Sequence, residues 1–452
     1  MTDVIIIGAG LAGLNAARKL EKSGHTVQVI EARDRVGGRN LAQVLEDGNV
    51  LEMGGQWIGP VQERICALCD ELGLERYPVH NTGHVMVYDG KQKKMKTHKE
   101  AAPPFNVFEL LDLDRVVKKI TKMANSIDTK APWEHPKAKE WDSQTYDSWV
   151  ERTPLTNKVK QFLRLIGEAI FSTEPTDFSF LHFLFYIKSG KDIETLIAID
   201  RGAQQERVVG GTQLISKRIA AALKNEVELN SPVTRIAQNE NKVTVYAGAK
   251  SWTAKKAIIA IPPTLAGRIT YDLPMPANRD QLTQRVPMGN VIKMHVVYKT
   301  PFWRKEGWTG QVISFEGPVK VVLDNTPPNV DYGVIVCFIE AGEGRIATEW
   351  SPEKREAVVI DGLARYFGDA ARTYEAYYEM NWVKEPYSRG CYGGHFPPGV
   401  WTAFGKYLRK PVGHIHWAGT ETATEWNGYM EGAIRSGHRA ADEIIALGNT
   451  AL

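Results

Sequence analysis

The sequence predicts an α/β (α+β) protein with a Rossmann-like dinucleotide-binding domain and an inserted substrate domain of mixed sheet and helices. Three observations support this fold class. The chain has 452 residues, which is too long for one ordinary hydrophobic core. Its first forty residues follow the order strand, glycine turn, helix, strand. Helical patterns then dominate to about residue 200, and strand-rich stretches return from about residue 205.

The N-terminal segment is expected to form one βαβ unit, the size of a nucleotide-binding half-domain. Residues 4–7 are a β-branched run, typical of a strand buried on both faces of a parallel sheet. Apolar residues near helical spacing between Leu11 and Leu20 predict a helix. Residues 27–30 then predict the second strand.

A glycine-rich turn lies between that first strand and helix. Gly8 permits a tight turn, Gly10 lets a pyrophosphate approach the backbone, and Gly13 lets the helix pack on the strand. Glu31 closes the second strand, where a carboxylate can accept hydrogen bonds from ribose hydroxyls. The complete pattern predicts dinucleotide binding, and an acid at this position argues against an NADP phosphate.

The remaining elements suggest that the cofactor domain is discontinuous. We expect helices over residues 107–123, 159–170 and 178–187, and strands over 226–229, 243–246, 257–261, 291–298 and 333–339. We predict a cofactor domain of residues 1–75, 205–290 and 384–452, and a substrate domain of residues 76–204 and 291–383.

Composition excludes several classes of function. A net charge of +3 gives no reason to expect a nucleic-acid partner or an anionic membrane. No run approaches the roughly 18 apolar residues of a membrane span, and apolar residues begin at Val4 without a leader, so we expect a cytoplasmic location. Cys66 and Cys69 form a C-x-x-C within an amphipathic helical pattern, without a second pair at zinc spacing. We therefore expect two buried thiols and no metal site.

Further motifs follow in order along the chain. The paired glycines of the R-x-G-G-R run would bring the backbone close to a ligand, while Arg33 and Arg39 could neutralise its phosphates. The other motifs are GGQWIGP at 54–60, VPMGNVIK at 286–293, SRGCY at 388–392, AGTETAT at 418–424 and NGYMEG at 427–432. As an ordered set these motifs resemble the flavin monoamine oxidase family, in a form without the C-terminal membrane helix of the animal enzymes.

The resemblance implies an FAD domain of the p-hydroxybenzoate hydroxylase type. Cys391 matches the cysteine that the family joins to the 8α carbon of the flavin as a thioether. The alternative is that Cys391 is a buried thiol with a structural role only. The remaining cofactor positions implied are Gly54, Gly55 and Gln56 near the flavin, Val233 at the adenine, and Gly419, Thr420, Glu421, Gly428 and Met430 around the ribityl chain and ring. A homodimer is a possible assembly.

The same resemblance assigns catalytic roles. Tyr392 and Tyr429 match an aromatic cage whose π-faces attract and align an amine. Lys293 resembles a lysine that holds a water against flavin N5, although most lysines lie at the surface. Trp382 matches an aromatic residue flanking the ring, with a core tryptophan as the alternative.

The substrate pocket implied by the resemblance has seven positions. They are Trp57, Glu168, Ala169, Ala198, Gln205, Val321 and Phe338. Trp57 replaces a tyrosine of the animal enzymes, and small residues at the gating positions Ala198 and Val321 predict one open cavity. Glu168 either binds a second ammonium, which would favour a diamine, or faces solvent.

These features predict oxidative deamination of a primary amine by FAD and dioxygen, giving an aldehyde, ammonia and hydrogen peroxide. One alternative is a diamine or polyamine oxidase of the putrescine type, which has the same chemistry. A second alternative is a flavin-binding protein without oxidase activity, acting as a sensor or assembly protein.

Overall fold

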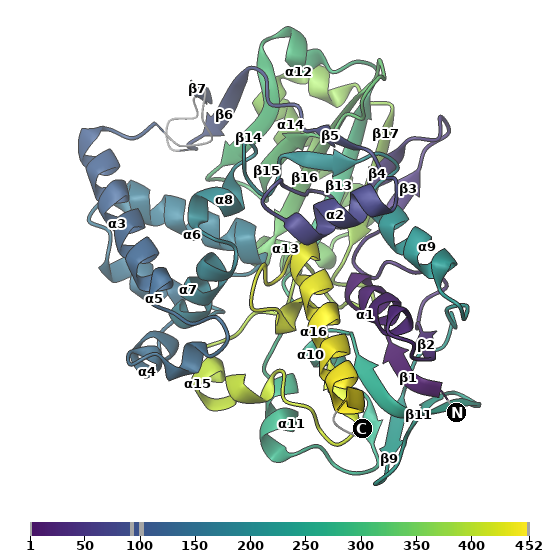
Figure 1. Cartoon of the computed structure of the whole chain (residues 1–452). Helices are drawn as coiled ribbons and strands as arrows, with labels where there is room; N and C mark the ends of the chain where they lie inside the picture. Colours follow the sequence, from purple (N-terminus) through teal and green to yellow (C-terminus); the bar gives the residue numbers. More distant parts are fainter. Residues whose placement is uncertain (1, 91–94, 99–103, 450–452) are drawn as a thin grey trace.

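Two seven-stranded sheets carry the chain in a computed structural model that describes residues 2–90, 95–98 and 104–449 (Figure 1). The first sheet has the order β12-β9-β10-β11-β1-β2, with β18 also paired to β11. Its strands are β1 (Thr2–Ile7), β2 (Val27–Ile30), β9 (Arg235–Gln238), β10 (Val243–Ala247), β11 (Lys250–Ile259), β12 (Thr270–Tyr271) and β18 (Ile415–Trp417).

The second sheet has the order β17-β13-β16-β15-β14-β6-β7. Its strands are β6 (His84–Tyr88), β7 (Met95–His98), β13 (Val291–Tyr298), β14 (Trp308–Ser314), β15 (Val319–Asp324), β16 (Gly333–Glu340) and β17 (Ala376–Asn381). The strands of each sheet fall within the residue ranges predicted for one domain, and the exact domain limits stay a prediction.

The predicted βαβ unit is confirmed. Strand β1 pairs in parallel with both β2 and β11, so that Ile6 lies between Val29 and Ile258. Helix α1 (Leu11–Lys22) follows the glycine turn and packs beside α16 (Met430–Asn449), the C-terminal helix (Figure 1). The buried apolar residues of both helices join one core with the strands, which fixes the start of α1 against the sheet.

The second sheet presents two chemically different faces because side chains alternate along each strand. Ile292 and Met294 of β13 pack in an apolar core with Leu363 of α14 (Pro352–Phe367). Val291 and Phe338 belong to another cluster on the opposite face. Cys391 and Trp57 also pack in the cluster on that opposite face.

A group of helices lies beside this second sheet and shares a hydrophobic core of its own (Figure 1). They are α3 (Val107–Asn125), α4 (Ala138–Asp142), α5 (Tyr146–Arg152), α6 (Asn157–Phe171), α7 (Phe180–Ser189) and α8 (Ile193–Ile197). Helix α3 begins at a capping box, in which Asn106 accepts from the Glu109 backbone and Glu109 accepts from the Asn106 backbone. Helix α7 is buried at every position except Lys188, as its apolar sequence predicts.

Shorter elements complete the chain. They are β3 (Ala42–Val44), β4 (Val50–Glu52), β5 (Arg76–Pro78), β8 (Glu206–Val208), α2 (Glu63–Glu71), α9 (Gln213–Ala222), α10 (Pro263–Ala266), α11 (Ala277–Thr283), α12 (Phe302–Lys305), α13 (Ala341–Thr348) and α15 (Val400–Phe404). Cys66 and Cys69 lie on α2 as buried free thiols. Within the described ranges, no helix is both long and apolar enough to cross a membrane.

Two predicted strands differ from the structure. The strand at 226–229 is wrong, because only Glu228 forms a bridge, with Ile30. The strand predicted over 257–261 begins at Lys250 and ends at Ile259. Residues 250–254 of this strand pair with β10, and residues 257–259 pair with β18. The strand is longer than predicted because β10 adds pairing at its start.

Candidate active site

A cavity of about 360 Å³ connects the glycine turn after β1 with the inner face of the second sheet. At the first end its wall includes Gly8, Gly10, Glu31, Arg33, Gly38 and Ser388. At the second end its wall includes Trp57, Lys293, Val321, Phe338, Trp382, Cys391, Tyr392 and Tyr429. The cavity is thus long enough to bring both sets of predicted residues to one continuous surface.

The glycine turn leaves room for a ligand at the start of α1. Gly8 has a φ of +103°, and a Cβ at Gly13 would lie 2.0 Å from the Gly8 carbonyl oxygen. Gly10 and Gly38 approach closely, because a Cβ at Gly38 would lie 3.3 Å from the Gly10 Cα atom. The first residues of α1, Leu11 among them, line the cavity. The positive end of the helix dipole therefore faces a site suited to phosphate.

Glu31 is held rigidly at this end of the cavity. Its Oε2 atom accepts a hydrogen bond from the Ala9 N–H at 2.8 Å, and its Oε1 atom accepts one from the Arg33 N–H at 3.0 Å. Arg33 donates from Nη2 to the Ser388 hydroxyl at 2.9 Å, but its buried Nε has no partner among the described residues. An acceptor inside the cavity would satisfy this group, and a phosphate oxygen fits.

Arg39 is engaged by protein groups. It forms an ion pair with Glu421, with Nη1 and Oε1 2.6 Å apart, and donates to the Tyr392 carbonyl oxygen at 2.8 Å. Arg39 also lines the cavity, and its charge is already compensated by the Glu421 carboxylate. Its predicted role at a phosphate stays a prediction. Glu421 lies behind the cavity wall rather than on it.

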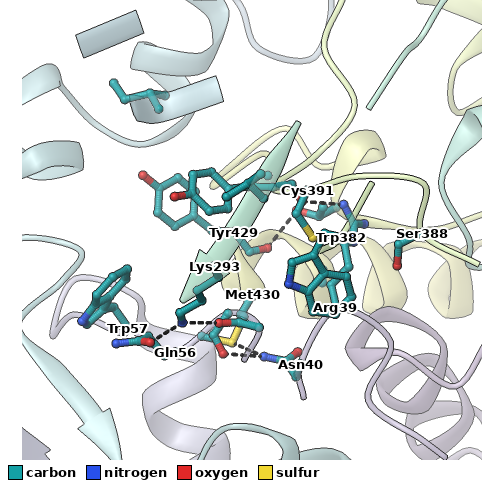
Figure 2. A pocket seen from close by; sticks show the side chains of 18 of the residues that line it. Arg39, Asn40, Gln56, Trp57, Lys293, Trp382, Ser388, Cys391, Tyr429 and Met430 are labelled. Atoms are coloured by element: carbon teal, nitrogen blue, oxygen red, sulfur yellow. Dashed lines mark hydrogen bonds between the residues drawn. The ribbon is translucent and has the colours of Figure 1, made fainter. Parts of the chain in front are cut away.

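Lys293 points from β13 into the cavity, toward the segment after β4 (Figure 2). Its ammonium donates to the Gly54 carbonyl oxygen at 2.8 Å and to the Gln56 side-chain oxygen. The side chain is 3 % exposed, so it is not a surface lysine. Burial lowers the pKa of Lys293 to about 7. An amine that can be neutral or charged near neutral pH therefore lies at the cavity wall.

A buried polar network supports Lys293 from behind. The Gln56 amide donates to Asn325 Oδ1 at 2.6 Å, and the Asn325 amide lies 3.2 Å from His295 Nδ1. Arg207 donates to the Asn325 carbonyl oxygen at 2.9 Å and forms an ion pair with Glu52. Since these groups are buried and partnered, they fix the position of Gln56 and hence of the ammonium.

Aromatic rings surround this part of the cavity. The ring centroids of Trp57 and Phe338 are 6.0 Å apart, and those of Phe338 and Tyr392 are 6.4 Å apart. Lys293 Nζ lies 5.4 Å from the Trp57 centroid, and Tyr429 lines the same cavity. These π-faces suit an amine.

Trp382 and Cys391 lie together in one buried cluster with Phe338. The Trp382 indole donates to the Met53 carbonyl oxygen at 2.9 Å, which fixes its ring. Burial raises the pKa of the Cys391 thiol to about 12.

The far end of the cavity is apolar. One face of α6 contributes residues at helical spacing, namely Phe162, Leu165, Ile166, Ala169 and Ile170. Residues in and after α8 form the neighbouring wall, namely Leu196, Ile197, Ile199, Ala203 and Gln204. A hydrocarbon or aromatic substrate body would therefore be buried here.

Comparison with known proteins agrees with this geometry. Residues 11–445 match the family of flavin containing amine oxidoreductases. The chain belongs to this family. It is 40% identical over 445 residues to a probable flavin-containing monoamine oxidase A of Dictyostelium discoideum, covering 98% of this chain and 97% of that one. It is 38% identical over 447 residues to the human flavin-containing amine oxidase B, covering 98% and 86%.

Solved structures show the same relationship. A double mutant of putrescine oxidase superposes with a TM-score of 0.95 at 35% identity, covering 98% of this chain and 99% of that one. Cyclohexylamine oxidase from Brevibacterium oxydans superposes with a TM-score of 0.94 at 31% identity, covering 99% of both chains. The protein is a flavin-containing amine oxidase, and its family implies FAD.

Two predicted pocket positions of this amine oxidase are shifted by one residue. Gln204 lines the cavity, whereas the Gln205 side chain accepts a hydrogen bond from the Arg201 N–H at 2.7 Å. Ile197 and Ile199 line it in place of Ala198. The chain is extended at Ala198, so consecutive side chains point to opposite sides. The expectation of small gating residues on this side is therefore wrong.

Three further predicted residues do not reach the wall. Glu168 forms an ion pair with Lys320, with Oε2 and Nζ 2.5 Å apart, and its side chain is only 16% exposed. Glu168 therefore does not face solvent, and its carboxylate is already paired with a lysine rather than available to a second substrate ammonium. Gly13 packs closely against Gly8 and Ile6, in agreement with its predicted role in packing the helix on the strand, and it does not line the cavity. Val233 packs on the core of the first sheet and does not line the cavity either.

The amine oxidase also has wall residues that the sequence analysis missed. Polar examples are Asn40, Ser388, Gln204 and Glu340. Asn40 donates to Met430 Sδ at 2.9 Å (Figure 2). It also donates to the Thr212 hydroxyl at 2.8 Å. Glu340 could have been found from alternation, because it follows Phe338 by two residues on β16.

Proposed function

We propose that the enzyme oxidises a primary amine to an aldehyde, ammonia and hydrogen peroxide. The observation that carries this proposal is one cavity that joins the glycine turn of β1 to Lys293 and the two tyrosines. When bound, FAD supplies the redox chemistry, accepting a hydride equivalent from the amine α carbon and passing two electrons to dioxygen.

The chain's own residues bind and orient the reactants. Tyr392 and Tyr429 align the amine between their π-faces, and Trp382 flanks the cofactor ring. Lys293, already held by Gly54 and Gln56, is suited to hold a water at the ring. The apolar wall of α6 excludes bulk water from the substrate body.

The preferred substrate is an arylalkyl or aliphatic monoamine. The far wall is apolar, and the Glu168 carboxylate is neutralised by Lys320 rather than free for a second ammonium. The alternative, a putrescine-type diamine oxidase, is supported by the structural similarity to putrescine oxidase. Peroxide production with benzylamine, tyramine and putrescine distinguishes them, and a preference for putrescine would favour the alternative.

The same preparation tests whether the protein is an oxidase at all. Anaerobic mixing with a suitable amine should bleach the flavin absorbance, and air should restore it with release of peroxide. A flavin that no amine bleaches would support the sensor or assembly alternative.

We further propose that Cys391 is joined to the flavin. Its thiol lies at the cavity wall in a cluster with Trp382, close to the predicted ring position. A thioether to the 8α carbon replaces one S–H and one C–H bond, and dioxygen takes up the two electrons released. Acid precipitation should leave yellow colour in the protein pellet, whereas Cys391→Ala should release it to the supernatant.

A further inference from the structure

Glu340 places a carboxyl group at the wall of the amine cavity. It is the last residue of β16, directly opposite Val291 of β13. Its side chain is partly buried and lines the cavity together with Phe338 and Tyr392. At the substrate end of the cavity, no other described wall residue is an Asp or a Glu.

Two hydroxyl groups hold this carboxyl. The Ser172 hydroxyl donates to Glu340 Oε1 at 2.8 Å, and the Tyr392 hydroxyl is also hydrogen-bonded to the carboxyl group. Ser172 ends α6 in a left-handed conformation with a φ of +49°, and Ala341 directly after Glu340 has a φ of +55°. Such conformations are costly for residues other than glycine, so the surrounding contacts must impose this arrangement.

Two charged groups act on the Glu340 carboxyl in opposite directions. Glu168 of α6 repels its negative form and Lys320 of β15 attracts it, while those two residues are paired with each other. Burial raises the pKa of Glu340 to about 7, the largest influence on it. The carboxyl can therefore both lose and gain a proton near neutral pH.

The proposed reaction requires that the substrate ammonium lose a proton. An alkyl amine is mainly an ammonium ion at neutral pH, whereas hydride transfer from the α carbon requires the nitrogen lone pair. The Lys293 nitrogen donates hydrogen bonds to the Gly54 carbonyl oxygen and the Gln56 side-chain oxygen, so it acts as a donor and not as a proton acceptor. Glu340 is the wall residue with the chemistry to accept the ammonium proton.

We propose that Glu340 binds the substrate ammonium and takes its proton before oxidation, with Tyr392 and Ser172 positioning the carboxylate. One N–H bond breaks and one O–H bond forms, which leaves a neutral amine and a neutral carboxylic acid without any transfer of electrons. This inference rests on the proposed amine oxidase function.

The test compares two substrates of the same shape but different basicity. They are 2-phenylethylamine, mostly an ammonium ion at about pH 8, and its 2,2-difluoro derivative, mostly a neutral amine there. Anaerobic stopped-flow bleaching of the flavin is measured below saturation, for the wild-type holoenzyme and Glu340→Gln. We expect Glu340→Gln to slow bleaching by 2-phenylethylamine on the order of 10²-fold at about pH 8 and to leave the difluoro amine within about twofold.

The pH profile gives a second readout. The ratio of the wild-type to the Glu340→Gln bleaching rate with 2-phenylethylamine should fall by about tenfold for each unit of increasing pH, because solvent then deprotonates the substrate. Ser172→Ala, which keeps the carboxyl but removes one hydrogen bond, should show the same pattern with a smaller loss. Glu343→Gln, three residues further along the chain and outside the cavity wall, should behave as the wild type.

Several outcomes would overturn the proposal. An equal loss with both amines would indicate a packing role, and no loss with either would exclude a role in proton transfer. A loss confined to diamines would make Glu340 a second ammonium site. A wild-type enzyme bleached by neither amine would instead refute the proposed oxidase function itself.

Discussion

Arg39 and Glu421 form a two-point ion pair between two distant parts of the chain. Their Nη1 and Oε1 atoms are 2.6 Å apart, and their Nη2 and Oε2 atoms are 3.2 Å apart. The pair connects the loop after β2 with the segment before α16, 382 residues further along the chain. The Glu421 side chain is 1% exposed, so this contact lies inside the protein.

Glu421→Gln should destabilise the protein by about 3–5 kcal/mol, because it leaves the Arg39 charge unpaired in a buried setting. The denaturation midpoint in urea, followed by tryptophan fluorescence, measures this change. Asp272→Asn breaks the exposed pair with Arg235 and should change the midpoint little. Similar effects of both substitutions would contradict the interpretation.

The lowered pKa of Lys293 predicts a particular pH dependence of stability. In the unfolded chain this lysine keeps its proton to about pH 10, whereas in the folded protein it loses it near pH 7. Between these values the unfolded state binds more protons, so stability rises with pH. The wild-type apoprotein should therefore gain stability relative to Lys293→Met from pH 7 to about pH 10.

Urea midpoints at several pH values, measured for both proteins, check this sign. Below pH 7 the difference between them should stay constant. Substituting the exposed Lys354 by Met provides the control, whose curve should run parallel to the wild type. A parallel curve for Lys293→Met as well would show that the lysine titrates normally.

Asn325 should prove important although it lies outside the predicted set of residues. Asn325→Ala removes the partner of the Gln56 amide and leaves buried polar groups unsatisfied. We expect a loss of about 1–3 kcal/mol in the free energy of unfolding. We also expect slower flavin bleaching by amine, because Gln56 would no longer fix Lys293. Normal bleaching kinetics would limit the network to a structural role.

The proposed bond to the flavin should form faster at higher pH. Burial raises the pKa of Cys391 to about 12, and the thiolate is the nucleophile. Apoprotein mixed with FAD in air should therefore gain acid-stable flavin about tenfold faster for each pH unit from 7 to 9. A rate independent of pH would show that thiolate formation does not limit the reaction.

The sequence by itself determined the features whose signals are local. The glycine turn, α1 and Glu31 follow one another within a single βαβ unit, so their spacing already defines the phosphate end of the cavity. Strand β13, with Lys293 on it, begins and ends where its apolar run predicts. In such segments the local pattern of apolar residues marks the element, although the hydrogen-bond partners of β13 are the distant strands β16 and β17.

The tertiary structure decided how distant side chains pair and which of two adjacent residues faces the cavity. Arg39 is bound by Glu421, Glu168 by Lys320, and Glu340 by Ser172, all across more than one hundred residues of chain. Gln204 lines the cavity and Gln205 does not, because adjacent side chains of an extended segment point to opposite sides. Charge partners and side-chain direction are set by long-range packing, which the local pattern of residues does not encode.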